Sequence, residues 1–222
     1  MKNKRFDIDS YKGVVFDLDG TLVDSLWLWD KVDTEFFKKR GMECPADYKK
    51  DIMAMGIEKV ADYTIERFNL REKPDDIIRE WYECAAYLYA AEVELMPGVL
   101  EYIEFLREHD VKIALATAND RKLSEECLKN NEILECFHNI TTLREVNGIK
   151  GEPDIYNLAA EKMGLNNKEC IVFEDILQGI EGAKKGGYRV VAFKNKYNKD
   201  NEEIFEKADK VVSDYRELCI KN

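Results

Sequence analysis

Two aspartates one residue apart, Asp17 and Asp19, follow a short apolar run near the start of the chain. The run Val14–Phe16 has the composition of a strand buried on both faces, which is typical of a parallel sheet. Open α/β sheets bind ligands at the carboxyl ends of their strands, where these two carboxylates would stand. Like charges held this close repel each other unless a cation or a proton lies between them. The run therefore predicts either a catalytic carboxylate pair or an ordinary Asp-Gly turn after a strand.

Polar side chains also end two later apolar runs and precede one helix. Thr117 ends a second predicted strand, and Glu174 and Asp175 end a third. Lys150 lies shortly before a predicted helix. Because the carboxyl ends of parallel strands meet at one edge of the sheet, we expect all these side chains to share a crevice with the aspartate pair.

Several carboxylates, a hydroxyl and an ammonium in one crevice suit phosphoryl transfer. Hard oxygen ligands, in a chain with only two histidines, favour Mg²⁺ over a transition metal. One aspartate can then act as a nucleophile and form an aspartyl-phosphate. The neighbouring carboxyl group can protonate the leaving alcohol and afterwards deprotonate the attacking water. A hydroxyl and a lysine can hold the phosphoryl oxygens as charge moves during transfer.

Strands and helices alternate from residue 97 onward, which predicts an α/β fold with a parallel sheet and helices on both faces. Pro97-Gly98 opens the first of these helices. The other predicted helices cover Arg121–Lys129, Asp154–Met163 and Leu177–Lys185. The predicted strands are Val111–Thr117, Phe137–Thr141, Cys170–Phe173, Tyr188–Phe193 and Lys210–Val212. The polar run Lys194–Glu203 is expected to be a surface loop.

The segment from Leu26 to Glu94 interrupts this alternation. It has a heavy load of aromatic residues and no convincing strand, and its predicted helices are Leu26–Lys39, Glu58–Phe68 and Asp75–Ala91. A helical insert of this length between the first and second strands predicts a separate small domain on two linkers. The linkers are expected near Val23–Ser25 and Glu94–Met96.

The order of these motifs resembles that of the haloacid dehalogenase superfamily. The matching residues are Asp17-Leu18-Asp19-Gly20-Thr21, Thr117, Lys150 and Glu174-Asp175. Leu22-Val23-Asp24-Ser25 and Met96-Pro97-Gly98-Val99 resemble its β-phosphoglucomutase-like and small-metabolite phosphatase members. The resemblance covers nearly the whole chain. It implies a Rossmann-like catalytic core over residues 1–24 and 96–222 and an inserted α-helical cap over residues 25–95.

The resemblance implies catalytic roles for individual residues. Asp17 would be the nucleophile, and Asp19 the general acid and base. Thr117 and Lys150 would hold the transferring phosphoryl group, and Lys150 would also offset the charge of Asp17. Asn119, two residues past Thr117, would contact the phosphate or the substrate.

The resemblance also implies a Mg²⁺ site. Its ligands would be Asp17, the backbone carbonyl of Asp19, and Asp175, with Glu174 as a direct or water-mediated ligand. Relatives commonly carry a small polar residue after the Glu-Asp pair, whereas this chain has Ile176. We expect that difference to remove one supporting hydrogen bond without abolishing the metal site.

The predicted cap leaves two questions open. Met55-Gly56-Ile57-Glu58-Lys59 matches the position of the family's cap loop that faces the substrate. Lys59 either binds a second anionic group of the substrate or is an exposed lysine at a helix start. Trp27 and Trp29 either wall the substrate pocket or belong to the core of the small domain, and we favour the core for at least one of them.

The leading functional hypothesis is a Mg²⁺-dependent phosphatase acting on a small phosphorylated metabolite, most simply a sugar or polyol phosphate. The alternative is a phosphomutase of the β-phosphoglucomutase type, which shares every core residue. The Met55-Gly56-x-x-Lys59 loop is similar to that of phosphonoacetaldehyde hydrolases, but those enzymes have a small residue in place of Asp19. A non-catalytic binding role is disfavoured, because a retired site has little reason to keep such costly repulsion.

The amino-acid composition limits the kinds of partner that we expect for the protein. The formal net charge of −11 argues against nucleic acid or an acidic membrane as the main partner. Six cysteines without a CxxC pair indicate reduced thiols and a cytoplasmic location. The N-terminal residues lack the apolar core of a signal peptide. A cap that closes over one edge of a sheet needs no second copy, so we expect a monomer.

Overall fold

The computed structural model describes residues 11–52, 55–146 and 148–219 of the chain. These residues form two compact units. The sheet unit comprises the chain up to Ser25 and from Val93 onward, and the helical unit comprises Leu26–Glu92. Each unit is described by itself.

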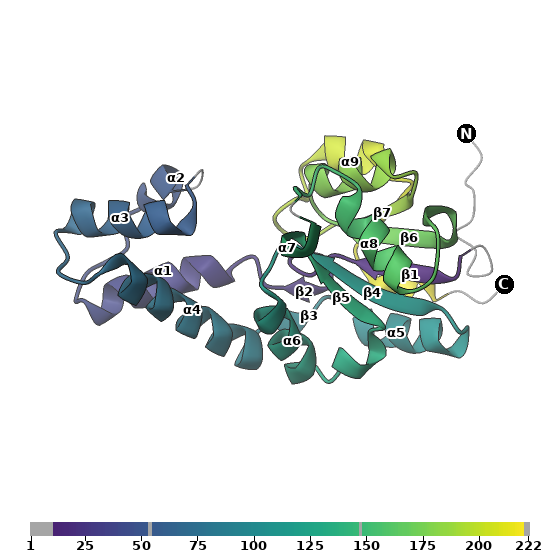
Figure 1. Ribbon diagram of the computed structural model, residues 1–222, viewed down its shortest axis with the longest axis horizontal. Coiled ribbons are helices and arrows are strands. Elements are labelled where there is room, and N and C mark those ends of the chain that lie inside the picture. The colour runs from purple at the N-terminus through teal and green to yellow at the C-terminus, as the bar shows by residue number, and fades with distance from the viewer. Residues whose placement is uncertain (1–10, 53–54, 147, 220–222) are drawn as a thin grey trace. The chain divides into compact units, whose positions relative to one another are not determined.

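The sheet unit is built on a parallel sheet (Figure 1). Among the described residues the sheet has six strands in the order β5-β4-β1-β6-β7-β8, and every neighbouring pair is parallel. The strands are β1 (Gly13–Phe16), β4 (Lys112–Thr117), β5 (Asn139–Thr142), β6 (Cys170–Glu174), β7 (Arg189–Phe193) and β8 (Lys210–Val212). The predicted α/β fold with a parallel sheet is confirmed.

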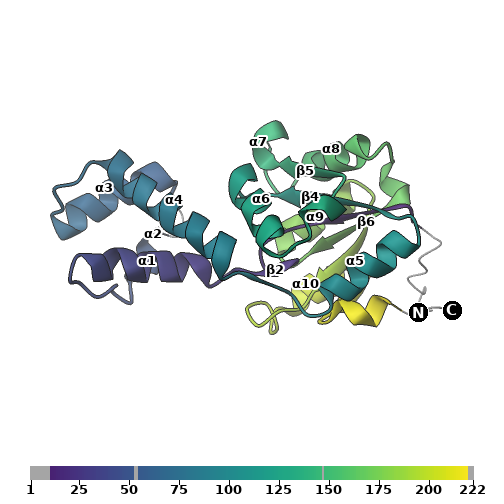
Figure 2. The ribbon, with the colours of Figure 1, turned by 90° about the horizontal axis from the view of Figure 1, so that it is seen from below.

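Helices cover both faces of the sheet (Figures 1 and 2). They are α5 (Val99–Glu108), α6 (Arg121–Asn130), α7 (Leu143–Val146), α8 (Asp154–Lys162), α9 (Leu177–Lys185) and α10 (Glu202–Lys207). Short 3₁₀ turns are η2 (Leu134–Cys136), η3 (Asn167–Glu169) and η4 (Tyr215–Leu218). The side chain of Asp120 caps α6 by accepting from the backbone N–H of Lys122, which satisfies one of the unpaired donors of the first turn.

The alternation of strand side chains divides the core into two layers, because successive residues of a strand point to opposite faces. Val15, Ala114 and Val172 are buried on one face, in a cluster with Tyr156 of α8 and Ile180 of α9. This layer packs α8 directly against the central strands. Tyr156 is therefore held in place by the packing of α8 against the sheet.

The opposite face is aromatic. Phe16 of β1 and Phe173 of β6 stack with ring centroids 4.9 Å apart. Tyr102 of α5 and Tyr215 of η4 meet Phe16 edge to face, at 6.2 Å and 5.8 Å. Such pairs add about 0.5–1.5 kcal/mol each beyond the burial of their surface. They hold the central strands whose ends carry the acidic residues.

The predicted linker segments pair with each other. β2 (Val23–Asp24) and β3 (Glu94–Leu95) form an antiparallel ladder in which Val23 lies opposite Leu95. The backbone N–H of Met96 also donates to the carbonyl oxygen of Leu22 at 2.9 Å. Two-residue strands carry no periodic signal, which is why the sequence predicted linkers here and no strands.

The helical unit consists of α1 (Leu28–Lys39), α2 (Tyr48–Ile52), α3 (Ile57–Phe68) and α4 (Pro74–Ala91), as far as its described residues show. α1 and α4 pack side by side (Figure 2). Phe37 is central to the packing, with ring centroids 5.0 Å from Tyr48 and 4.7 Å from Phe68. α2 was not predicted, because a five-residue helix is too short to show helical periodicity.

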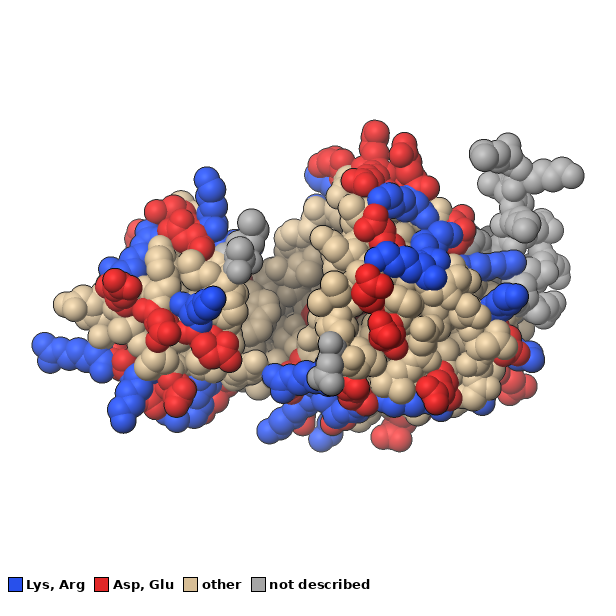
Figure 3. All heavy atoms as spheres, turned by 45° about the horizontal axis from the view of Figure 1, so that its top comes forward, with Lys and Arg blue, Asp and Glu red and all other residues tan. Residues whose placement is uncertain are grey.

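Charged side chains of both signs are interspersed on the face of the sheet unit seen in Figure 3. Ion pairs join neighbouring elements of the sheet unit, such as Lys184–Asp209 at 2.7 Å. Exposed pairs of this kind contribute about 0–1 kcal/mol each. In the part of the chain that the structure describes, no helix combines the length and apolar character needed to cross a membrane.

Candidate active site

The register of the parallel strands places the predicted strand-end residues at one edge of the sheet. Phe16 pairs with Leu115 of β4 and with Phe173 of β6, so Asp17 stands at the carboxyl edge between these two neighbours. Its backbone N–H donates to the carbonyl oxygen of Phe173 at 3.0 Å. The side chains of Thr117, Glu174 and Asp175 are buried at the same edge, and Asp17 itself is only 2% exposed.

A tight turn follows Asp17. The backbone N–H groups of Leu22 and Val23 both donate to the carbonyl oxygen of Leu18, at 2.9 Å and 3.0 Å. Gly20 adopts a φ of 80°, a conformation that glycine takes without steric penalty. This turn returns the chain to β2 directly after the aspartate pair.

Ser25 and Asn119 both donate to the carboxylate of Asp19, which lies within this turn. The hydroxyl of Ser25 donates to its Oδ1 at 2.6 Å, and the amide Nδ2 of Asn119 donates to its Oδ2 at 3.0 Å. The backbone N–H of Asn119 in turn donates to the hydroxyl of Thr117 at 3.0 Å. Asn119, which the sequence predicted to contact phosphate or substrate, thus binds Asp19. Its contact with a ligand stays a prediction.

Lys150 bridges two buried carboxylates. Its Nζ lies 2.6 Å from Oδ1 of Asp17 and 3.0 Å from Oε1 of Glu174. Burial alone would lower the pKa of Lys150, but the two carboxylates outweigh it and raise that pKa. The hydroxyl of Tyr156 donates to the same Glu174 oxygen at 2.8 Å. Lys150 therefore stays an ammonium, directed at Asp17.

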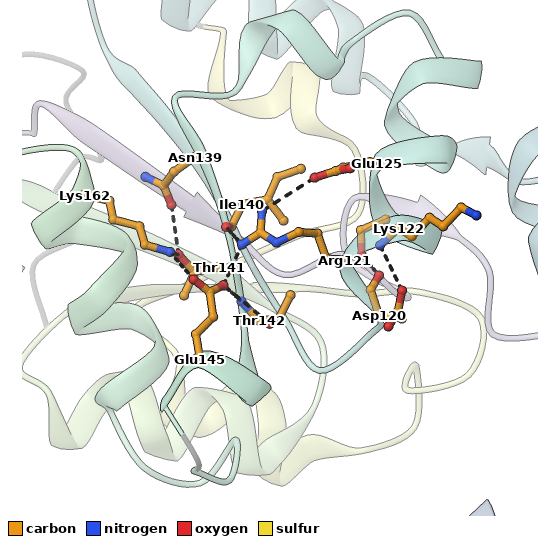
Figure 4. Close-up of polar contacts among 11 residues, drawn as sticks. Asp120, Arg121, Lys122, Glu125, Asn139, Ile140, Thr141, Thr142, Glu145 and Lys162 are labelled. Carbon is orange, nitrogen blue, oxygen red and sulfur yellow. Dashed lines mark hydrogen bonds and ion pairs between the residues drawn. The ribbon is translucent and has the colours of Figure 1, made fainter.

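A polar network holds α7, the short helix that precedes the segment carrying Lys150 (Figure 4). Glu145 of α7 accepts from Arg121 of α6 at 2.7 Å, from Lys162 of α8 at 2.6 Å and from the backbone N–H of Thr142 at 2.9 Å. Burial raises the pKa of Glu145, but the ammonium of Lys162 and the N–H of Thr142 outweigh it and lower the pKa to about 2. Glu145 thus ties α7 to α6, α8 and the end of β5.

Three of the buried carboxylates could hold a metal ion. One oxygen each from Asp17, Glu174 and Asp175 lie within 4.8 Å of one another. Oδ2 of Asp17 is buried and has no hydrogen-bond partner among the described residues. A buried, unpaired carboxylate oxygen is costly, and a divalent cation would offset that cost. The donor set is all oxygen, which is the preference of Mg²⁺ and Ca²⁺.

Burial and neighbouring negative charges raise the pKa values of two carboxyl groups in this cluster. Burial, together with the neighbouring charge of Glu174, raises the pKa of Asp17 to about 8. Burial and the charge of Asp17 raise the pKa of Asp175 to about 7. Carboxylates that resist ionisation in this way are stabilised in their charged form by a bound cation.

The site includes buried polar residues that sequence reasoning missed. Tyr156 contacts Glu174 as described above, and Asn195 donates its amide Nδ2 to Oδ2 of Asp175 at 2.9 Å. Asn195 and Asn198 are each 8% exposed, so the prediction that Lys194–Glu203 is a surface loop is wrong at these two positions. A run of Lys, Asn and Asp has the composition of a solvated loop, and no local signal marks the buried asparagines.

The helical unit contains a cavity of its own. It has a volume of about 470 Å³, and its lining includes Trp29, Asp33 and Trp81. Burial raises the pKa of Asp33 to about 6. Trp29 lines this cavity and is 43% exposed, so it is not a core residue. Lys59 is exposed and is not among the lining residues, and its predicted contact with substrate stays a prediction.

Comparison with known proteins places the chain in a family. A family model described as haloacid dehalogenase-like hydrolase matches residues 14–193. The chain belongs to the haloacid dehalogenase-like hydrolases. The resemblance inferred from the sequence motifs is thereby confirmed, and the protein is an enzyme of the hydrolase class.

Several members of the family are similar over most of their length. The crystal structure of CbbY from Rhodobacter sphaeroides in complex with phosphate has a TM-score of 0.74 and 26% identity, covering 94% of this chain and 96% of that one. The phosphorylated carbohydrates phosphatase of Thermotoga maritima is 25% identical over 79% of this chain and 82% of its own. Hexitol phosphatase B of Escherichia coli is 24% identical over 94% of each chain.

Within this haloacid dehalogenase-like hydrolase, the structure brings together most of the predicted site residues. Asp17, Lys150 and Glu174 are in direct contact, and Asp175 completes the acidic cluster. Asp19 lies in the turn after β1, outside that cluster of side-chain oxygens. The binding of a metal ion by the backbone carbonyl of Asp19 stays a prediction.

Proposed function

We propose that the protein is a Mg²⁺-dependent phosphatase that hydrolyses a small phosphorylated metabolite through an aspartyl-phosphate intermediate on Asp17. The arrangement of Asp17 carries the proposal. One of its oxygens is paired with the ammonium of Lys150 at 2.6 Å, and the other is buried without a partner among the described residues. A nucleophilic carboxylate needs this combination of fixed orientation and nearby positive charge.

Asp17, Glu174 and Asp175 would hold the Mg²⁺ ion, together with the backbone carbonyl of Asp19. When bound, the ion would neutralise phosphate charge and relieve the repulsion among these carboxylates. The buried oxygen of Asp17 and the raised pKa values of Asp17 and Asp175 support this assignment.

The first step is attack by a carboxylate oxygen of Asp17 on phosphorus. A phosphorus–oxygen bond forms to Asp17 as the bond to the leaving alcohol breaks, and Asp19 donates a proton to that alcohol. Lys150 and Thr117 hold the phosphoryl oxygens during the transfer. The hydrogen bonds from Ser25 and Asn119 keep Asp19 in one orientation.

The second step returns the enzyme to its starting state. Asp19, now ionised, removes a proton from a water molecule, which attacks the phosphorus of the aspartyl-phosphate. The bond between phosphorus and Asp17 breaks, inorganic phosphate leaves, and the proton stays on Asp19 for the next turnover. A single carboxyl group thus acts first as acid and then as base.

We propose a sugar or polyol phosphate as the substrate class, because the names of two similar family members describe phosphatases of such compounds. The presence of Asp19 disfavours cleavage of a carbon–phosphorus bond, since the imine route of phosphonoacetaldehyde hydrolases needs no acid at this position.

A screen of phosphorylated metabolites tests the proposal, with inorganic phosphate and isomerised substrate measured in parallel. We expect Mg²⁺-dependent release of phosphate from at least one sugar or polyol phosphate. Conversion to an isomeric phosphate without release would establish the mutase alternative instead. Imine trapping by borohydride with phosphonoacetaldehyde would identify the third chemistry.

A further inference from the structure

Asn195 joins the two strand ends that carry the acidic cluster. Its Nδ2 donates to the carbonyl oxygen of Gly20 at 2.8 Å and to Oδ2 of Asp175 at 2.9 Å. Gly20 lies in the turn that follows Asp17, and Asp175 follows β6. One amide group therefore links the turn of the nucleophile to the carboxylate of a neighbouring strand.

The orientation of this amide is fixed by unambiguous partners. Oδ1 of Asn195 accepts from the backbone N–H groups of Tyr197 and Asn198, at 2.8 Å and 3.0 Å. Backbone N–H groups can only donate, so the oxygen must face them and the NH₂ must face Gly20 and Asp175. The carboxylate of Asp175 therefore receives a true N–H donor.

Asn198 forms hydrogen bonds with Asn195 and with the main chain of Asp175. Its Oδ1 accepts from the backbone N–H of Asn195 at 2.9 Å. Its Nδ2 donates to the carbonyl oxygens of Asp175 and Phe193, each at 2.9 Å. The two asparagines thus exchange side-chain and backbone hydrogen bonds, and Asp175 is bound through both its side chain and its main chain.

This support comes from a distant loop and not from the residue next in sequence. Ile176, which follows Asp175, has no polar side-chain atom. The sequence predicted that its presence removes a supporting hydrogen bond from the metal site. The loop after β7 supplies such bonds, because Ala192 of β7 pairs with Glu174 of β6 and the following residues run past Asp175.

The side-chain groups that donate to the carboxylate of Asp175 are electrically neutral. Asp175 is held by a neutral amide and by the hydroxyl of Thr21 at 3.3 Å, whereas Asp17 is held by the ammonium of Lys150. A neutral donor orients a carboxylate without adding a positive charge that would repel a cation. Among the described residues, Oδ1 of Asp175 has only the long contact to Thr21, so this oxygen keeps acceptor capacity for a metal ion.

We propose that Asn195 is a positioning residue of the metal site, which orients Asp175 toward the bound cation and is itself oriented by Asn198. This inference rests on the proposed Mg²⁺ site. Partners that orient metal ligands typically change metal affinity by about 10–100-fold when they are removed.

Titration of MgCl₂ into the metal-free full-length protein, followed by isothermal calorimetry, tests the inference without turnover. For Asn195→Ala we expect the dissociation constant of Mg²⁺ to rise by about 10–100-fold. For Asn198→Ala we expect a smaller rise in the same direction. Saturating Mg²⁺ should bring kcat of Asn195→Ala back to within about threefold of wild type, because Asn195 acts through Asp175.

Asn139→Ala is the matched control. Asn139 donates its Nδ2 to the carbonyl oxygen of Ala159 at 3.1 Å and so links β5 to α8, away from the acidic cluster. Its loss should lower the melting temperature in EDTA and leave the Mg²⁺ dissociation constant unchanged. Asn198→Ala carries the test if Asn195→Ala does not fold.

The outcomes separate the inference from the proposed function. Wild-type protein that binds no Mg²⁺ would overturn both. Wild-type protein that binds Mg²⁺, with variants at Asn195 and Asn198 that bind it equally well, would overturn the positioning role alone. A matching loss of affinity in Asn139→Ala would show a general effect on folding and would also overturn it.

Discussion

Nζ of Lys150 lies 2.6 Å from Oδ1 of Asp17, while Oδ2 of the same carboxylate is buried without a hydrogen-bond partner among the described residues. The two oxygens of Asp17 are therefore in different environments. The ammonium fixes one oxygen of the side chain, and one oxygen each of Asp17, Glu174 and Asp175 lie within 4.8 Å of one another. This asymmetry suits a carboxylate that attacks phosphorus while it also binds a cation.

Replacing the nucleophile should abolish turnover. For Asp17→Asn we expect phosphate release from an aryl phosphate to fall by about 10³-fold or more, because an amide is a far weaker nucleophile than a carboxylate. The rate is measured under saturating Mg²⁺, with the fold checked by circular dichroism. Activity near that of wild type would contradict the role of Asp17.

Replacing the proposed acid should affect substrates unequally. For Asp19→Asn we expect turnover of an alkyl phosphate to fall by about 10²–10⁴-fold, since its alcohol needs a proton to leave. With p-nitrophenyl phosphate, whose phenolate leaves without help, a burst of nitrophenol should precede slow hydrolysis. Stopped-flow absorbance detects the burst, and equal losses in the first step for both substrates would argue against an acid role.

The metal-free protein should lose stability as the pH rises from about 5 to 8. Asp17 and Asp175 have pKa values of about 8 and 7 in the folded chain, whereas unfolded aspartates titrate near 3.9. Between these values the folded state keeps protons that the unfolded state has released, so a rising pH favours unfolding.

Mg²⁺ and protons compete for the same carboxylates. The increase in melting temperature caused by Mg²⁺ should therefore be larger at pH 8 than at pH 6. Thermal melts at both pH values, with EDTA or with Mg²⁺, measure the difference. Asp17→Asn should flatten the pH dependence in EDTA, and a slope as steep as that of wild type would refute the assignment.

The network around Glu145 should stabilise the sheet unit. For Glu145→Gln we expect the free energy of unfolding to fall by about 1–3 kcal/mol at pH 7, because charge-assisted hydrogen bonds are weakened. Glu125→Gln is the matched control, since Glu125 meets the same Arg121 in a single exposed pair at 3.6 Å. That variant should lose less than about 0.5 kcal/mol. Urea denaturation measures both.

The same network predicts an acid dependence. The pKa of Glu145 is lowered to about 2 in the folded chain, below the value of about 4.3 for an unfolded glutamate. Its stabilising effect is therefore complete above about pH 4.3 and disappears as the pH falls toward 2. The difference between wild type and Glu145→Gln should shrink over that window, and a constant difference would contradict the assignment.

Local patterns were sufficient for the strands and for the residues that end them. The apolar run before Asp17 and the one before Glu174 each predict a buried strand, because burial on both faces excludes polar residues from the whole run. Thr117 and Lys150 were noted by their place next to a predicted strand or helix, and the resemblance to the haloacid dehalogenase superfamily implied their roles. Short elements such as α2 and the β2–β3 ladder were not predicted, because two to five residues are too few to show a hydrophobic period.

The sequence by itself determined which residues end the central strands and are therefore proposed to do the chemistry, and at which edge of the sheet they stand. Only the tertiary structure decided how those residues are held. Asn195 and Tyr156 are far from Asp175 and Glu174 along the chain, and their own neighbourhoods resemble a solvated loop and an ordinary helix. Sheet register and helix packing bring them to the acidic cluster. Such contacts arise between distant segments, so no local pattern could have predicted them.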